Sequence, residues 1–193
     1  MTLDTINRKA PYRTKTVRKM SIETFLKRYR KGKPGVKYEY NKGIIEKTET
    51  IKFKEQYIFH NLQQLFITTP NFKEEGLLVQ ELEVWTSANQ WRKPDISFIT
   101  KAQVQAATKG NEPIPEFVIE VISKNDTINQ VKNKVDEYFS AGVKILWHIF
   151  PELEKIEIYR SADKSETFSQ DNICSAEPIV EGFKIIVADV FKK

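Results

Sequence analysis

Two apolar segments on either side of an amphipathic segment constrain the fold of this chain more than any other feature. Residues 117–122 (FVIEVI) and 143–150 (VKILWHIF) are short and almost wholly apolar, which is typical of strands buried on both faces. Residues 127–140, between them, repeat apolar side chains at helical spacing, and Gly142 follows as a stop signal. A buried strand, a helix and a second buried strand form a right-handed crossover between parallel strands. The chain is therefore predicted to have an α/β fold.

Further strands and helices are expected around this unit. Ser21 is a predicted N-cap for a short helix at 22–30, and residues 36–53 alternate as a hairpin around a turn at 41–43. The other predicted elements are a helix at 55–68, strands at 77–85, 95–100, 155–160 and 183–187, and a polar loop at 86–93. Together they predict one domain over residues 20–193: a mixed sheet flanked by helices, with an N-terminal helix and hairpin extension.

Charge is distributed unevenly along the sequence. The net charge is +5, yet residues 1–37 alone hold 12 Lys and Arg against two acids, so the rest of the chain is mildly acidic. Clustered Lys and Arg bind nucleic acid by displacing counterions from phosphate, and residues 1–19 are therefore predicted to be a flexible nucleic-acid-binding arm. A solvated tail without a partner is an equally open interpretation. The residues expected to contact phosphate are Arg13, Lys15, Arg18 and Lys19.

Several classes of protein are disfavoured by the composition. No apolar stretch approaches the roughly 18–20 residues needed to cross a membrane, and residues 1–20 lack the apolar core of a secretory signal. Cys174 is the single cysteine and cannot form an internal disulfide, while one Cys and two His are too few for the usual zinc sites. We therefore expect a cytoplasmic protein that does not bind a membrane.

Glu120 and Asp95 are the two acids whose positions suggest chemistry. Glu120 lies inside the apolar segment 117–122, where a carboxylate is unfavourable unless it is paired, hydrogen-bonded or bound to a metal. Asp95 follows Pro94 at the start of the preceding predicted strand. Taken singly, the first could be the partner of a buried Lys or Arg and the second a turn residue. Together, on neighbouring strands, they form an oxygen-rich site of the kind that suits Mg²⁺ or Mn²⁺ and phosphodiester hydrolysis.

These residues and their surroundings resemble a known family. Pro94-Asp95, followed 25 residues later by Glu120, resembles the PD-(D/E)XK nuclease signature. Six blocks, in order, are similar to the Uma2 (DUF820) family: MSIETFL (20–26), YEYNKGIIE (38–46), KPDISFI (93–99), FVIEVIS (117–123), KVDEYFSAGVKILWHIFP (134–151) and KIEIYR (155–160). The resemblance implies a restriction-endonuclease-like fold and a Mg²⁺-dependent endonuclease acting on DNA. It also implies that Asp95 and Glu120 are catalytic and bind the metal.

The basic residue of the PD-(D/E)XK signature is displaced in this sequence. Its usual position, two residues after the acid and on the same face of the strand, is Ile122. In the resembled family the following helix supplies this residue, which implies a catalytic role for Lys134. A helix that folds back over its strand would bring Lys134 level with Glu120. Lys124 and Lys132 are weaker candidates, and a surface position for Lys134 is the alternative.

Three functional hypotheses follow from the sequence. The first is a Mg²⁺- or Mn²⁺-dependent endonuclease whose partner is nucleic acid, expected to be DNA. The second is a catalytically impaired nucleic-acid-binding module on the same fold, favoured by the displaced lysine and by Lys42-Gly43-Ile44 where the family has an acidic Asp-Gly-Glu turn. The third is a protein-interaction scaffold that retains the acids without using them. By analogy with other nucleases of this fold, a homodimer is also expected.

Overall fold

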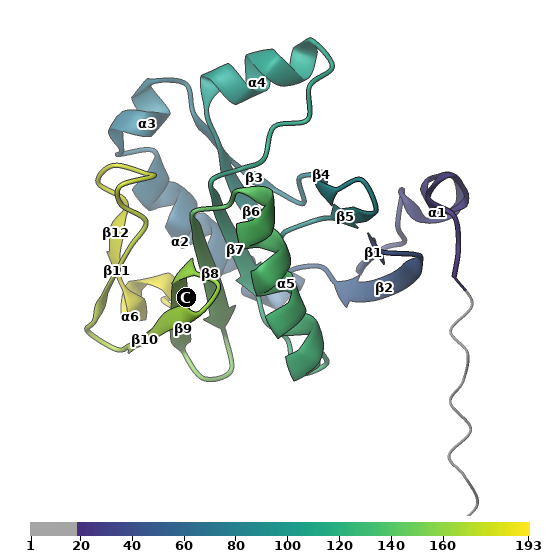
Figure 1. The fold of residues 1–193 in the computed structure, drawn as a ribbon. Coiled ribbons are helices and arrows are strands. Elements are labelled where there is room, and N and C mark those ends of the chain that lie inside the picture. Colours follow the sequence, from purple (N-terminus) through teal and green to yellow (C-terminus); the bar gives the residue numbers. More distant parts are fainter. Residues whose placement is uncertain (1–18) are drawn as a thin grey trace, which may run out of the picture.

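The strand–helix–strand unit forms the centre of the fold. In the computed structural model, which describes residues 19–193, β7 (Phe117–Val121) and β8 (Ile145–Phe150) are parallel neighbours joined by α5 (Ile128–Ala141) (Figure 1). Thr127 caps α5 by accepting a hydrogen bond from the backbone N–H of Gln130, and Gly142 ends it with a φ of 114°. The predicted α/β crossover is therefore confirmed.

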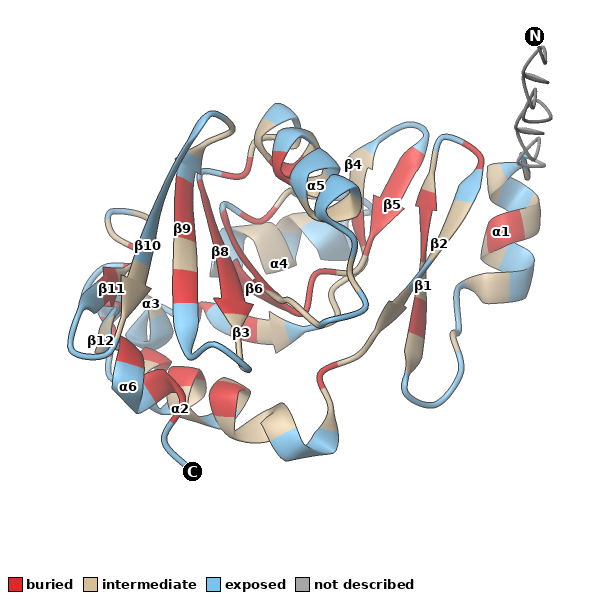
Figure 2. Cartoon of the chain, turned by 90° about the horizontal axis from the view of Figure 1, so that it is seen from below, coloured by how far each residue is buried: buried red, intermediate tan, exposed pale blue. Residues whose placement is uncertain are grey.

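This unit belongs to a mixed six-stranded sheet. The strand order is β10 (Lys164–Ser169), β9 (Lys155–Ser161), β8, β7, β6 (Ile96–Ile99) and β3 (Leu77–Gln80). Among these six strands, β7 and β8 form the parallel pair and the other neighbours are antiparallel. The central strands are buried, whereas β10 at the edge is largely exposed (Figure 2).

The two faces of the sheet are covered by different helices. Phe117, Ile119 and Trp147 pack in the larger core together with α2 (Gln56–Phe66) and α6 (Val187–Val190). Val118 and Leu146 point the other way and pack against α5 in a second core. Because side chains alternate along a strand, Glu120 shares the face of Val118 and is directed toward α5. The remaining elements of this part are η1 (Phe53–Glu55), α3 (Pro70–Lys73), α4 (Lys101–Thr108), β11 (Ile173–Ser175) and β12 (Lys184–Ile186).

A second sheet combines the N-terminal hairpin with two strands from residues 84–92. Its strand order is β2 (Ile44–Glu49), β1 (Val36–Asn41), β5 (Gln90–Arg92) and β4 (Val84–Ser87), and α1 (Ile22–Tyr29) packs on it (Figure 1). Ser21 caps α1, as predicted, by accepting a hydrogen bond from the backbone N–H of Thr24. The predicted helix and hairpin extension is therefore confirmed.

The predictions for residues 77–93 are wrong in detail. The expected strand at 77–85 ends at Gln80, because Glu81 adopts a positive φ of 52° that breaks the extended backbone. The expected polar loop at 86–93 contains β5, which pairs with both β4 and β1. Trp91 is buried against Phe25 of α1. The polar composition of residues 86–93 indicated exposure to solvent, but α1, which is distant in the sequence, covers Trp91.

The helix α4 has no counterpart in the sequence prediction, although Thr100 and Gln103 form a capping box at its start. None of the helices in residues 19–193 combines the length and the apolar character that crossing a membrane requires.

Candidate active site

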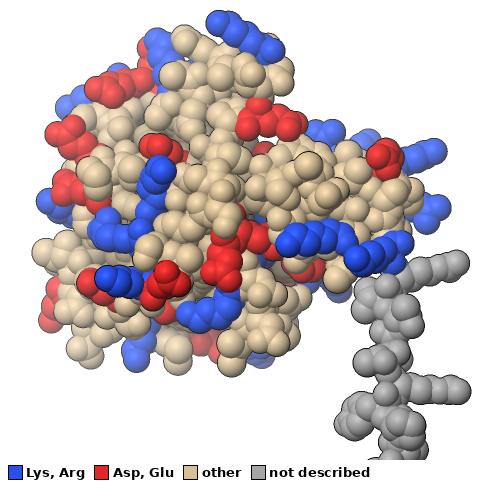
Figure 3. Space-filling model, in the orientation of Figure 1, with Lys and Arg blue, Asp and Glu red and all other residues tan. Residues whose placement is uncertain are grey.

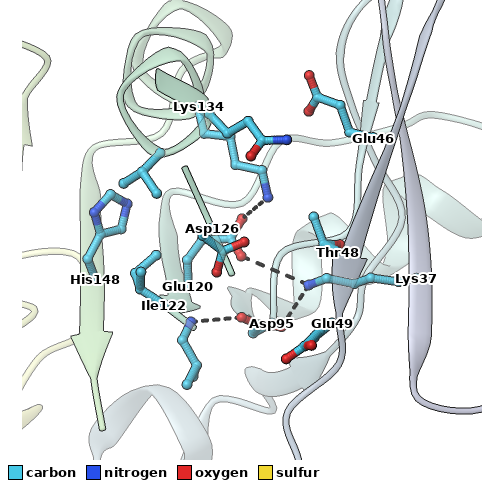
Figure 4. A pocket seen from close by; sticks show the side chains of 13 residues that line it. Lys37, Glu46, Thr48, Glu49, Asp95, Glu120, Ile122, Asp126, Lys134 and His148 are labelled. Carbon is cyan, nitrogen blue, oxygen red and sulfur yellow. Dashed lines mark hydrogen bonds and ion pairs between the residues drawn. The ribbon is translucent and has the colours of Figure 1, made fainter. Parts of the chain in front are cut away.

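Asp95 and Glu120 are brought together by the pairing of β6 with β7. Ile96 of β6 lies opposite Ile119 of β7, so Asp95, immediately before β6, lies beside Glu120 (Figure 4). Both acids are buried. The carboxylate of Asp95 is held by the backbone N–H of Val121, which donates to Oδ2 at 2.7 Å. The structure therefore places the two acids on one wall of a single pocket.

Lys37 of β1 is a residue of this pocket that the sequence analysis did not single out. Its side chain is 3% exposed, and its ammonium donates to Asp95 Oδ1 at 2.7 Å and to the carbonyl oxygen of Lys93 at 2.6 Å. The same ammonium lies 3.9 Å from Glu120 Oε2. Lys37 was counted with the basic N-terminal residues, but it is a buried partner of acids. The one available signal is that Lys37 and Glu39 share a face of β1 and alternate with Tyr38 and Tyr40.

Lys134 approaches Glu120 from α5. Its ammonium lies 3.2 Å from Glu120 Oε1 and 2.9 Å from Glu39 Oε2. Tyr138, one turn further along α5, donates a hydrogen bond of 2.6 Å to the same Oε1 atom. Lys134 therefore lies level with Glu120, as expected for a helix that folds back over its strand. The alternative of a surface lysine is wrong, because only 11% of the Lys134 side chain is exposed. In contrast, Lys132 donates to Tyr159 Oη.

Arg92 of β5 connects Glu39, the acid that Lys134 contacts, to two further acids. Its guanidinium binds Glu137 of α5 through two hydrogen bonds of 2.7 Å each, contacts Glu39 Oε2 at 3.2 Å and also pairs with Glu46. Glu39 in turn accepts a hydrogen bond of 3.0 Å from the backbone N–H of Lys93. The second sheet (the small sheet, β2-β1-β5-β4) is thus joined to α5 by charged side chains as well as by packing.

The connected charged groups are not balanced. Three cations meet five acids, giving a formal charge of −2: Lys37, Arg92 and Lys134 against Glu39, Glu46, Asp95, Glu120 and Glu137. A divalent cation would bring this sum to zero.

The outer surface in Figure 3 shows basic and acidic side chains interspersed over the visible face.

The pKa values follow from burial and from these neighbours. Burial would raise the pKa of Glu39, but Lys134 and Arg92 outweigh it and hold that pKa at about 2. Burial would likewise raise the pKa of Glu120, and Lys134 and Lys37 reverse the effect. Burial raises the pKa of Asp95 to about 6, since Lys37 offsets the loss of hydration only in part and Glu120 adds repulsion. Burial opposes the charge of Lys134, but the two acids beside it raise its pKa, so it is protonated at neutral pH.

One oxygen of each carboxylate in the pocket is placed to fit a hard divalent cation. Both hydrogen bonds to Glu120 use Oε1, while Oε2 makes only the long contact with Lys37 among the polar contacts of the described residues. Asp95 Oδ1 is the other oxygen directed toward Lys37. Residues 19–193 contain no cluster of three or more His, Cys, Asp or Glu suited to a metal. An ion here would therefore have two carboxylates, with water and substrate phosphate as further ligands, which is typical of Mg²⁺.

Other predicted site residues lie elsewhere. Arg13, Lys15 and Arg18 fall outside the described residues. Lys19 is exposed, and its aliphatic chain lies against Gly43 in the turn between β1 and β2.

The fold and the paired acids define the class of this protein as restriction-endonuclease-like, with a mixed sheet flanked by helices. A similar fold occurs in the crystal structure of a "putative nuclease belonging to DUF820" from Anabaena variabilis. The TM-score is 0.69 at 19% identity, and the match covers 80% of this chain and 89% of that one. The family described as Uma2, "Putative restriction endonuclease", matches residues 22–188, so the chain belongs to the Uma2 family. A search of curated proteins found no match.

Proposed function

We propose that this chain is a metal-dependent endonuclease that hydrolyses phosphodiester bonds in DNA, with Mg²⁺ or Mn²⁺ as cofactor. The observation that carries the proposal is the position of Asp95, immediately before β6, beside Glu120 of the neighbouring strand β7, with Glu120 Oε2 left without a hydrogen bond from any of the described residues. The net negative charge of the surrounding network supports it. Membership of a family described as "Putative restriction endonuclease" supports it as well.

Asp95 Oδ1 and Glu120 Oε2 are the proposed ligand atoms for the ion. When bound, a divalent ion orients water and offsets the charge that develops on the phosphate. The protein's own contribution is to fix these oxygens. The N–H of Val121 holds Asp95, and Tyr138 and Lys134 hold the Oε1 atom of Glu120, so that its Oε2 atom is directed into the pocket.

Lys134 is proposed to act as a fixed positive charge. Its raised pKa keeps the ammonium protonated at neutral pH, so a role as a base toward water is disfavoured. A protonated lysine beside the metal ligands can instead position Glu120 and offset negative charge on the substrate phosphate. Lys134 is thus proposed as the displaced lysine of the signature.

Residues 1–19 are proposed as the segment that binds the DNA backbone, through Arg13, Lys15, Arg18 and Lys19. The excess of basic residues over acids in this part of the chain supports the proposal. The catalytic domain is proposed to span residues 20–193. A homodimer, expected by analogy with other nucleases of the fold, is tested by sedimentation of the purified protein with and without DNA.

A second candidate function is nucleic-acid binding without cleavage. It is favoured by one specific observation, that Lys37 already pairs with Asp95 and lies near Glu120, and so supplies a counter-charge without a metal. The presence of Ile122 at the usual position of the signature lysine agrees with this candidate.

A cleavage assay separates the two candidates. Duplex DNA, single-stranded DNA and RNA are incubated with the protein in Mg²⁺, in Mn²⁺ and in EDTA, and Asp95→Asn is assayed beside the parent. The endonuclease is supported by cleavage of DNA that requires the metal and is lost in Asp95→Asn. Salt-dependent binding of DNA with no cleavage of any substrate would support the binding module instead.

A further inference from the structure

Lys37 occupies the region between the two carboxylates that are proposed to hold the metal. It reaches this position from β1, in the small sheet, whereas Glu120 lies in β7 of the large sheet and Asp95 immediately before β6 (Figure 4). Its ammonium is 2.7 Å from Asp95 Oδ1 and 3.9 Å from Glu120 Oε2, and its side chain is almost fully buried. A buried lysine at this place is a built-in cation of the site.

The contacts of Asp95 make Lys37 and a metal ion competitors. Oδ2 of Asp95 accepts a hydrogen bond from the backbone N–H of Val121, which is held in β7, so Oδ1 is the oxygen that an ion can reach by displacing only a side chain. Oδ1 is also the atom to which Lys37 donates its hydrogen bond. A divalent ion bound to this oxygen would lie within a few ångströms of the ammonium, where two positive charges repel strongly in a poorly hydrated pocket. Close binding of both cations to Oδ1 is therefore unfavourable.

Lys37 affects the charge balance of the site both without and with a bound metal. Without a metal, two neighbouring buried carboxylates would repel each other, and Lys37 supplies the charge that keeps them together. With a metal, the same lysine must withdraw from Asp95. It retains its second acceptor, the carbonyl oxygen of Lys93, which can keep the ammonium nearby.

We propose that Lys37 is an internal cation that exchanges with the divalent ion at Asp95 and thereby weakens metal binding in the absence of substrate. The proposal rests on the proposed metal site. It implies that the site stays assembled without metal and that metal binds less tightly than two free carboxylates would allow. After exchange, the freed ammonium lies where it can contact a phosphate oxygen of the substrate, so that substrate and metal favour each other's binding.

Calorimetric titration of Mn²⁺ into the metal-free protein tests the exchange without a cleavage assay. The variants are Lys37→Met, which removes the charge, and Lys37→Gln, which also keeps a hydrogen-bond donor for the carbonyl oxygen of Lys93. We expect both to bind Mn²⁺ at least about tenfold more tightly than the parent, because no ammonium has to be displaced. Lys52→Met is the matched control, since Lys52 pairs with Glu49 in the adjoining pocket and is 40% exposed.

Melting temperatures in EDTA and in Mn²⁺ provide a second measurement for variants that are less stable. Lys37→Met should melt well below the parent in EDTA, because Asp95 and Glu120 lose their counter-charge, and Mn²⁺ should recover most of this loss. Lys37→Gln should show the same pattern with a smaller initial loss. Adding Asp95→Asn to either variant should abolish the tighter binding, which shows that the exchange takes place at this carboxylate.

The outcomes separate this proposal from the proposed function. Measurable Mn²⁺ binding by the parent, with tighter binding by the folded Lys37 variants, supports the exchange. Equal or weaker binding by the folded variants overturns the exchange and leaves the metal site in place. Absence of Mn²⁺ binding in the parent and in both folded variants overturns the metal site itself, and the exchange with it.

Discussion

Lys134 Nζ lies 3.2 Å from Glu120 Oε1, although the two residues belong to different elements and are 14 positions apart. The same ammonium contacts Glu39 of the small sheet at 2.9 Å. One lysine of α5 therefore joins both sheets at the candidate active site. Because the contact is buried, the stability of the fold and the geometry of the site depend on the same side chain.

Replacing Lys134 should affect both properties. Lys134→Met keeps the apolar stem but leaves Glu120 and Glu39 without one counter-charge, so we expect a loss of about 3 kcal/mol in the free energy of unfolding. The rate of any metal-dependent cleavage by the folded variant should fall on the order of 100-fold or more. Urea denaturation and single-turnover cleavage measure the two effects.

The control for this prediction is Lys132→Met. Lys132 is an exposed residue of the same helix and donates to Tyr159 rather than to an acid of the site. Its replacement should change stability by no more than about 0.5 kcal/mol and leave cleavage unchanged. If Lys134→Met cleaves as fast as the parent when both are fully folded, Lys134 has no role beyond stability.

Glu120→Gln should remove most of the stabilisation by metal. A ligand that binds only the folded state raises its stability by mass action, about 2.7 kcal/mol at a concentration 100 times the Kd. The variant retains an oxygen for Tyr138 but lacks the negative charge that attracts the ion. The increase in melting temperature on adding Mn²⁺ should therefore be clear in the parent and small in the variant. An undiminished increase in Glu120→Gln would place the metal elsewhere.

Glu39 should contribute an acid-sensitive part of the stability. Its pKa is about 2 in the folded protein, below the ordinary glutamate value of 4.5, so its contribution is present above about pH 4.5 and is lost as the pH falls toward 2. Glu39→Gln removes this titration. The variant should therefore be clearly less stable than the parent at pH 7, and the difference should shrink at pH 3.5.

Urea denaturation at pH 7, 5 and 3.5 checks the expected convergence. Glu166→Gln, an exposed substitution on β10, is the control and should differ from the parent by no more than about 0.5 kcal/mol at each pH. A constant difference between Glu39→Gln and the parent over the whole range would contradict the prediction.

Deleting residues 1–19 should alter the binding of DNA rather than the chemistry. The deletion removes six Lys and Arg, and the logarithm of DNA affinity falls with the logarithm of salt concentration in proportion to the phosphates contacted. The salt dependence of the truncated protein should thus be flatter. At saturating protein, metal-dependent cleavage should be retained. Identical salt slopes for the two proteins would show that these residues do not contact DNA.

The sequence by itself determined the central architecture. The apolar segments that form β7 and β8, the Thr127 cap and Gly142 specify a strand, a helix and a parallel strand through local preferences and burial. A carboxylate inside such a strand also indicated the site, because Glu120 is unfavourable there without a partner. The resemblance to the Uma2 family implied the approach of Lys134, and the lengths of a strand and a helix that fold back on each other allowed it.

Only the tertiary structure decided how the charges of the site are paired. Lys37 and Arg92 are polar residues on short strands, and their sequence neighbourhood indicates exposure. They are buried because the small sheet packs against α5 and the large sheet, which brings acids from distant parts of the chain to each of them. Burial of a charged residue depends on these long-range partners, which the local sequence does not encode.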